Sequence, residues 1–102
     1  MSLRITRNGP VDLAPGTTIY EVPATQTATI NGINFINSKN ANVLTVSHYV
    51  DGTGVTNVLY TRDLQPYDNM SDTGPYALAE RDKLIIQASA AGMTYTSFID
   101  IP

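Results

Sequence analysis

The chain has 102 residues, no cysteine and a formal net charge of −3. This length suits one domain with its own core, and the lack of cysteine excludes disulfides and thiolate metal sites. The six basic residues are scattered and form no stripe that could neutralise phosphates, so we expect no nucleic-acid partner.

Residues 1–16 are predicted to form an N-terminal arm ahead of the main domain. Two turn signals, Gly9-Pro10 and Pro15-Gly16, interrupt this segment, which is too short to make its own core. A free arm would leave its apolar side chains in water, so we expect it to pack on a neighbouring chain, for example as a strand added to a sheet edge. The alternative, equally open here, is that Leu3–Thr6 joins the domain's own sheet. The arm residues expected to contact a partner are Leu3, Arg4, Ile5, Arg7, Val11 and Leu13. The two arginines among them would suit an acidic partner surface.

Residues 17–102 are predicted to form one β-sandwich domain. Short runs rich in Thr, Val, Ile and Tyr, separated by Gly, Pro, Asn and Asp, are typical of strands and turns. Apolar residues change parity at Asn31-Gly32, which predicts a β-bulge that returns both halves of that strand to the core. We expect hairpin turns at residues 38–42, 51–54 and 91–92. The expected strands span residues 17–23, 27–37, 43–50, 55–62, 82–90 and 93–101.

Residues 79–90 join four consecutive charges, Glu80 to Lys83, to an apolar run. Leu84, Ile86 and Ala88 share one strand parity and do not recur at helical spacing, so we predict a strand here. The charges then form a solvated turn at its start. Residues 63–76 are rich in turn formers and are expected to be the longest irregular region.

These elements predict an all-β fold, an antiparallel β-sandwich of six to eight short strands with a jelly-roll or Ig-like topology. A single flat sheet of so many short strands could not bury one face, whereas two packed sheets can. We expect Arg81 and Lys83 to lie outside the core. Strand parity places these residues inside it: Ile33, Phe35, Leu44, Val46, Leu84 and Ile86.

Two segments, TTIYEVPATQTATINGINFIN and LAERDKLIIQASAAGMTYT, carry a further pattern. Its positions are Tyr20, Val22, Pro23, Ala24, Ile33, Asn37, Leu78, Asp82, Leu84, Ala88 and Ser89. This pattern resembles a family of small β-sandwich domains in the virion proteins of tailed bacteriophages, and the likeness covers roughly residues 17–101. Arg81 stands where such domains usually have Gly, so we expect that turn to differ in backbone conformation.

The resemblance implies a non-enzymatic structural protein of the virion, assembled in the host cytoplasm. The leading hypothesis is a capsid decoration or cement protein that stabilises the head by non-covalent contacts, as a homo-oligomer bound to the major capsid protein or another virion protein. The alternatives are a neck, tail or fibre component, or a carbohydrate-binding β-sandwich module. No apolar stretch resembles a signal peptide or reaches the roughly 18 residues of a membrane span, so we expect no membrane partner.

We expect no catalytic residue, no metal site and no cofactor. His48 is the only histidine, and Ser47, Ser71 or Asp51 could join it in a Ser-His-Asp set, but the sequence has no nucleophile elbow. A histidine on an apolar strand face is more often packed or hydrogen-bonded.

Acidic residues offer two further candidate sites, each with a simpler interpretation. Asp68, Asn69 and Asp72 do not match the ligand spacing of a calcium loop and are expected to be solvated. Glu80 and Asp82 could form an acid-base pair, but basic residues flank them and surface charge is the expected role.

Six tyrosines are many for a chain of this length. Tyrosine suits interfaces because it has an apolar body and a polar tip. Tyr67 and Tyr76, in the long irregular region, are candidates for stacking on a sugar or docking on a partner. The alternative is that they cap the core of the sandwich.

Overall fold

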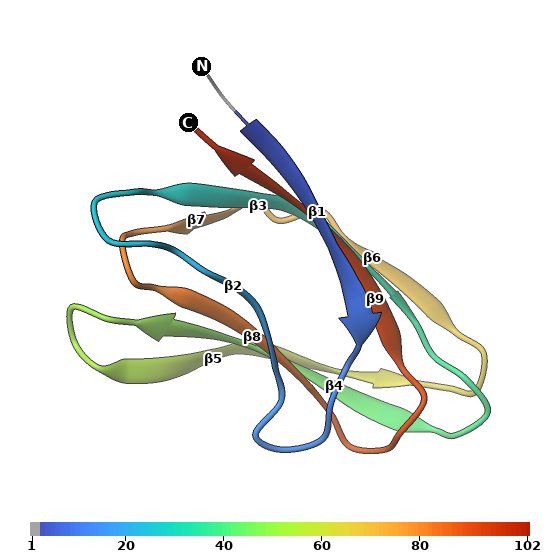
Figure 1. The fold of residues 1–102 in the computed structure, drawn as a ribbon. Coiled ribbons are helices and arrows are strands. Elements are labelled where there is room, and N and C mark those ends of the chain that lie inside the picture. The colour runs from blue at the N-terminus through green and yellow to red at the C-terminus, as the bar shows by residue number, and fades with distance from the viewer. Residues whose placement is uncertain (1–2) are drawn as a thin grey trace.

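The structure, a computed structural model, describes residues 3–102 and contains two β-sheets packed face to face (Figure 1). The prediction of an all-β sandwich is confirmed, with nine strands in the described residues rather than six to eight. No helix in this part of the chain could cross a membrane. The strands are β1 (Leu3–Pro10), β2 (Thr17–Glu21), β3 (Ala28–Ile36), β4 (Asn42–Val50), β5 (Val55–Leu64), β6 (Asn69–Asp72), β7 (Tyr76–Leu78), β8 (Lys83–Ala88) and β9 (Thr94–Ile101).

The strand order identifies the topology as a jelly roll. One sheet runs β1-β9-β3-β6, with β7 also pairing with β3, and the other runs β2-β8-β4-β5. The first strand therefore pairs with the last, β2 with β8, β3 with β6 and β7, and β4 with β5, all antiparallel. This nested pairing is that of one long hairpin rolled into two sheets, which distinguishes it from the Ig-like alternative.

The predicted bulge in β3 is present and works as expected. The register of β3 against β9 shifts between Ile30 and Gly32. Because of this extra residue, Ile30 and Ile33 both face the core, with exposed fractions of 0% and 1%. The bulge therefore lets one strand of mixed parity bury apolar residues along its whole length.

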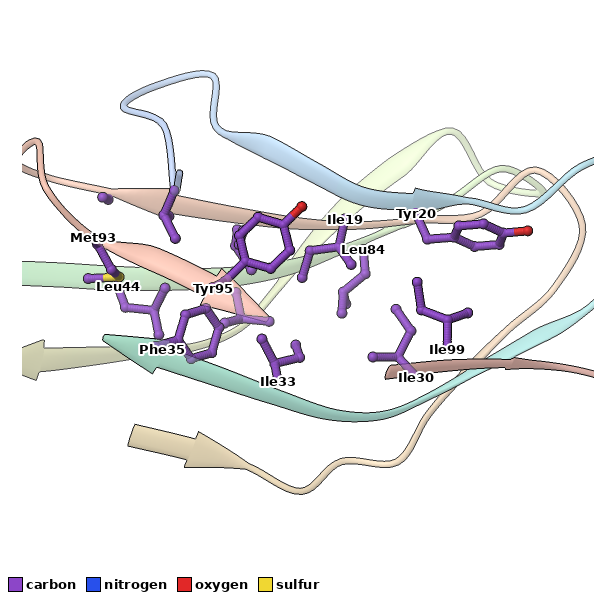
Figure 2. Close-up of a cluster of buried hydrophobic side chains, with 14 of the residues drawn as sticks. Ile19, Tyr20, Ile30, Ile33, Phe35, Leu44, Leu84, Met93, Tyr95 and Ile99 are labelled. Carbon is purple, nitrogen blue, oxygen red and sulfur yellow. The ribbon is translucent and has the colours of Figure 1, made fainter. Parts of the chain in front are cut away.

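The core lies between the sheets and is built from aliphatic and aromatic side chains of both (Figure 2). Complete burial of such a side chain contributes about 1.5–3 kcal/mol relative to exposure. The six residues predicted for the core are confirmed, each at most 1% exposed: Ile33, Phe35, Leu44, Val46, Leu84 and Ile86.

The N-terminal segment lies in the domain's own sheet rather than forming a separate arm. Residues Leu3–Pro10 form β1, an edge strand that pairs with β9 from Leu3 opposite Ile101 to Pro10 opposite Thr94 (Figure 1). Val11 follows, donates its amide to the carbonyl of Met93 and is buried. The alternative that this segment joins the domain's own sheet is therefore the one observed, because β9 offers a free edge of matching length.

Two of the three expected hairpins are instead crossings between sheets. Residues 38–42 connect β3 to β4, and residues 89–93 connect β8 to β9, strands that belong to different sheets. Buried amides build these crossings: the Asn37 side chain donates to the carbonyl of Gln65 at 2.9 Å, and that of Asn42 to the carbonyl of Ala90 at 2.8 Å. The hairpin at residues 51–54 is confirmed, and the region expected to be irregular contains β6 and the start of β7.

The charged turn at residues 80–83 corrects two expectations. Asp82 is not solvated but buried, with 3% of its surface exposed. Arg81 has a φ of 63°, the left-handed conformation that glycine adopts most easily. The turn therefore keeps the backbone conformation that the Gly of the resembled family would favour, although Arg occupies the position.

Candidate assembly surface

Strand β5 forms an uncovered edge of the molecule. It is ten residues long, pairs only with β4, and eight of its residues are exposed. Residues of a two-layer sandwich normally alternate between a covered and an open face. Here both faces of the strand are accessible along most of its length, so β5 offers backbone groups and side chains together.

Apolar side chains are concentrated on this edge. Val55, Val58 and Leu59 are 50%, 62% and 41% exposed. Val58 lies opposite Ser47, which in turn lies opposite Ile85, so these side chains share the outer face of the sheet. Leu59 is the extra residue of a bulge, since the register passes from Val46–Tyr60 directly to Ser47–Val58. An exposed apolar strand edge of this kind is typical of a contact surface.

One carboxylate ties β5 to the opposite sheet. The hydroxyls of Tyr60, in β5, and Tyr76, in β7, both donate to Oδ2 of Asp72, the latter at 2.5 Å. Burial, followed by the hydrogen bond to Asp72, raises the pKa of the Tyr60 hydroxyl above its ordinary range and that of Tyr76 to about 12. The same carboxylate accepts the amide of Gly74 at 2.9 Å. Asp72 therefore works as a structural clamp that fixes the position of the β5 edge.

A second carboxylate, Asp82, fastens the loops at one end of the sandwich. Its Oδ1 accepts the amide of Asp51 at 3.0 Å, and its Oδ2 accepts the amide of Ala79 at 3.1 Å and contacts His48 Nε2 at 2.9 Å. Burial alone would raise the pKa of this carboxyl, but the two amides and His48 together hold it below its ordinary value of 3.8. Asp82 thus joins the β4–β5 turn to the turn before β8.

The residues considered for a Ser-His-Asp set are not brought together. Ser47 and His48 are neighbours on β4 and point to opposite faces of the strand. Ser71 lies in the sheet that does not contain His48 and donates to Asn34 of the neighbouring strand β3, and Asp51 donates its backbone amide to Asp82. In the described residues, His48 is held by one carboxylate that is itself occupied by loop amides.

The two other acidic candidates also have structural roles. Asp68 accepts the amide of Gln65 at 2.9 Å and closes a turn. It lies before β6 and Asp72 ends that strand, so the two carboxylates are separated by about 13 Å along the chain. Glu80 accepts the amide of Thr25 at 2.6 Å, while its proposed partner Asp82 is buried. No group of three potential metal ligands occurs in residues 3–102.

The arm residues predicted to contact a partner are divided between the surface and the interior. Leu3 and Leu13 are exposed, at 60% and 49%. Arg4 forms a two-pronged pair with Asp100 at 2.7 and 2.9 Å, so its charge is matched within the sheet. Val11 is a core residue, and Ile5 packs against the core. Whether any of these residues contacts a partner stays a prediction.

Arg7 borders a groove that sequence reasoning missed. The groove, of about 530 Å³, opens between the edge strands β1 and β2. Arg7 lies over the ring of Tyr20, 5.8 Å from its centre, and Tyr95 lines the same groove. The three residues are far apart in sequence, and only the nested pairing of the strands places them together.

The two loop tyrosines do not form a common platform. Tyr67 is 76% exposed, whereas Tyr76 belongs to β7 and directs its hydroxyl at Asp72. β3 pairs with β6 near Tyr67 and with β7 at Tyr76, and the pairing positions, Ile36 and Ile30, are about 20 Å apart along the strand. A flat sugar could not stack on both rings at once.

The sequence contained one signal for the β5 edge. The exposed apolar residues of β5, Val55, Val58 and Leu59, occur at both odd and even positions, so they do not all lie on one face of the strand. A half-buried strand would alternate. The mixed pattern is typical of a strand that does not have one face in the core and the other in solvent.

Comparison with protein-family models found no match, and comparison with curated protein sequences found none. Solved structures with a similar fold include one of Bacillus endospore appendages, described as disulfide-linked pili, at 15% identity and a TM-score of 0.54, covering 99% of this chain and 86% of that one. A viral particle of infectious bursal disease virus matches at 14% identity and a TM-score of 0.58, and its Gx strain at 13% and 0.52.

The viral matches cover 99% of this chain but only 30% and 32% of the viral chains. At these identities the likeness shows the fold alone: a small β-sandwich domain of a kind that occurs in a virus particle and in a bacterial appendage. None of the three structures is described as coming from a tailed bacteriophage.

Proposed function

We propose that this protein is a structural subunit of a virus particle and acts by non-covalent assembly. The observation that carries the proposal is the uncovered edge of β5, with Val55, Val58 and Leu59 exposed beside unpaired backbone groups. A free strand edge with apolar side chains is a template for pairing with another chain, and folded domains usually protect such edges. An edge left open is therefore best explained by a partner that covers it.

The specific form of the proposal is a capsid decoration or cement protein, present as a homo-oligomer on the outside of the head. The similarity of this sandwich to a domain of a virus particle supports a structural role of that general kind. The pili of the Bacillus match are described as disulfide-linked, but this chain has no cysteine, so its own contacts must be of another kind. Each added contact of about 800 Å² per partner would raise the barrier to separating capsid subunits.

Two other roles remain as alternatives. A neck, tail or fibre component would use the same surface but at another place in the particle. A carbohydrate-binding module is the less favoured candidate, because Tyr67 and Tyr76 do not share a surface and Tyr76 is engaged with Asp72. In all the virion roles the protein would be assembled in the host cytoplasm, with the major capsid protein or another virion protein as partner.

We also propose that the protein is not an enzyme. His48 contacts Asp82, and both oxygens of that carboxylate accept loop amides, an arrangement that fixes loops rather than activating a nucleophile. The variant His48→Gln keeps a donor near Asp82 and should retain assembly. Hydrolytic turnover that disappears with this one change would overturn the proposal.

Electron microscopy of virus particles that carry a labelled copy of this chain tests the proposed role. A decoration protein should give repeated label over the head surface, and particles lacking the chain should open at lower temperature. Label confined to the neck, tail or fibres would favour the first alternative. Particles that never contain the chain, together with binding of purified protein to a glycan, would overturn the proposal in favour of the second.

A further inference from the structure

The sandwich is open along the side where strand β1 of one sheet faces strand β2 of the other (Figure 1). Each is the last strand at its end of a sheet, so on this side neither pairs with a strand of the described residues. The groove between them, of about 530 Å³, has the size of a ligand-binding site. Stacked sheets lie about 10 Å apart, roughly twice the spacing of about 4.8 Å between paired strands. One extended segment can therefore lie between the two edges.

Arg7 gives this groove a positive charge. Its side chain is exposed and lies on the inward side of β1, because Arg7 is opposite Ser97, which is fully buried. The guanidinium carbon lies 5.8 Å from the centre of the Tyr20 ring. A guanidinium placed over a ring keeps the N–H donors in its own plane free. Arg7 can therefore still hold a carboxylate through two parallel hydrogen bonds.

The acidic residues near the groove have partners of their own. Glu21 pairs with Lys83 at 3.3 Å, and Asp12 accepts the hydroxyl of Thr17 at 3.0 Å. Within residues 3–102, Arg7 belongs to no ion pair. Its charge therefore suits a carboxylate that comes from outside the chain.

We infer that this groove binds an extended acidic segment of a partner protein, which adds a strand between β1 and β2 and places one carboxylate on Arg7. The inference rests on the proposed assembly role and deepens it, because it gives the chemistry of a partner at a surface other than β5. An extended main chain can pair with the free backbone groups of both edges. A sugar or a small carboxylate would leave most of those groups unpaired.

The surroundings of Arg7 predict which residues flank the acidic one. Ile5 and Gly9 share the inward side of β1 with Arg7, and Ile5 packs against the core. Across the groove, Ile19 and Tyr20 are buried. Because side chains alternate along a strand, the residues two before and two after the acidic one would face this apolar surface. We therefore expect Asp or Glu with an apolar residue two positions away on each side.

The free edge strands of this chain do not offer such a segment to a second copy. β1 has no acidic residue, and Glu21 of β2 is already in an ion pair. Asp63 of β5 has Thr61 and Gln65 at the two flanking positions. Asp72, at the end of β6, already accepts two tyrosine hydroxyls. The expected partner is therefore a different protein.

Two synthetic peptides of the same composition test the inference. Their ends are blocked, so that one aspartate is the only carboxylate of each. The first, Lys-Ser-Val-Thr-Asp-Thr-Val-Ser-Lys, places Asp and both Val on one face of a strand. The second, Lys-Ser-Val-Asp-Thr-Thr-Val-Ser-Lys, places Asp on the opposite face. Binding is measured from the NMR shifts of the protein's backbone amides, with peptide up to about 5 mM so that weak binding is seen.

We expect the first peptide to shift the amides of β1 and β2 with a Kd of about 1 mM or less, and the second to bind at least about tenfold more weakly. Arg7→Gln should weaken binding of the first peptide at least about tenfold, whereas Arg7→Lys, which keeps the charge, should weaken it less. The matched control is Arg4→Gln, on the outer side of the same strand, where Arg4 pairs with Asp100. This variant should bind the first peptide as the original protein does.

Equal binding of the two peptides, no binding at about 5 mM, or full binding by Arg7→Gln would overturn the inference and leave Arg7 as a charge that only protects the edge. Acetate or galacturonate that binds the groove as tightly as the first peptide would also overturn it, because the groove would then take any carboxylate. A protein that binds the first peptide but never joins particles would overturn only the proposed function. A protein found on particles that does not bind the peptide would overturn only the inference.

Discussion

Ser97 is a hydroxyl residue in the middle of the apolar core. It is 0% exposed, and its Oγ has no hydrogen-bond partner among the described residues. Its neighbours across the ladder are Arg7 on β1 and Ile33 on β3. A buried polar group without a partner loses the hydrogen bonds it made in water, which costs about 1–3 kcal/mol.

We therefore expect Ser97→Ala to raise the free energy of unfolding by about 1 kcal/mol. Denaturation in urea would measure the change, with Thr96→Ala on the outer face of the same strand as a control expected within about 0.5 kcal/mol of the original protein. A Ser97→Ala protein less stable than the original would show that the hydroxyl has a partner in solution.

Arg81 holds a backbone conformation that costs a residue with a side chain about 1–2 kcal/mol. Arg81→Gly removes that cost but adds backbone freedom to the unfolded chain, worth about 0.5–1 kcal/mol. We expect a net gain of about 0.5–1 kcal/mol for Arg81→Gly and almost no change for Arg81→Ala, which keeps the Cβ atom. Thermal unfolding of both variants checks this. Equal stability of the Gly and Ala variants would contradict the left-handed turn.

At the scale of elements, Asp82 connects two turns, so the free energy of unfolding should depend on pH. Its pKa is lowered in the folded protein, so on acidification the unfolded chain takes up a proton first. The stability that Asp82 contributes is therefore complete well above pH 3.8 and is lost as the pH falls below that value toward the lower folded pKa.

Asp82→Asn replaces one acceptor by an amide donor that faces loop N–H groups. We expect a cost of about 1–3 kcal/mol near pH 7. The cost should shrink near pH 3, where the original protein has also begun to lose its carboxylate. Urea denaturation of both proteins at both pH values measures the difference. The contributions of the other acidic groups to the pH dependence cancel in this difference, because both proteins contain those groups. An equal cost at both pH values would mean that the carboxylate charge is not what joins the turns.

Strand β1 is an integral element of its sheet, which leads to a prediction opposite to that for a free arm. Deleting residues 2–14 would remove the strand paired with β9 and the buried Val11. We expect the shortened chain to fail to fold or to unfold at least about 10 °C lower. Circular dichroism on heating measures the midpoint. An unchanged midpoint would show that this segment pairs with β9 too weakly to matter.

At the scale of the whole molecule, local patterns in the sequence predicted the class of fold and six of the residues at the centre of its core. The alternation of apolar residues along residues 84–88 and the parity change at Asn31-Gly32 depend only on neighbours in the chain. Both features could therefore be predicted from the sequence. The pairing of β1 with β9 depends on contacts between the two ends of the chain, and no local pattern encodes it. The residues at 38–42 look like a hairpin turn because a hairpin and a crossing use the same turn formers.

The candidate surface was harder to predict than the fold, for a related reason. The sequence predicts a strand over Val55–Arg62, but the exposure of β5 depends on its place at the end of the sheet order. The motif residues of the resembled family behave differently. Asn37 and Asp82 are buried and hold loops through hydrogen bonds, so the motif describes how the fold is built and not what it contacts.

The most direct measurement of the central claim is the amount of Val58→Asp protein retained on virus particles. Val58 is 62% exposed, so the change should leave folding intact while placing an unpaired charge in the covered surface. The matched control is Ile36→Asp, at a residue 59% exposed on the other sheet. We expect occupancy of Val58→Asp to fall at least about tenfold, a loss of about 1.4 kcal/mol or more, while Ile36→Asp binds as the original protein does. Retention of Val58→Asp at the original level, or loss of Ile36→Asp instead, would contradict assembly through β5.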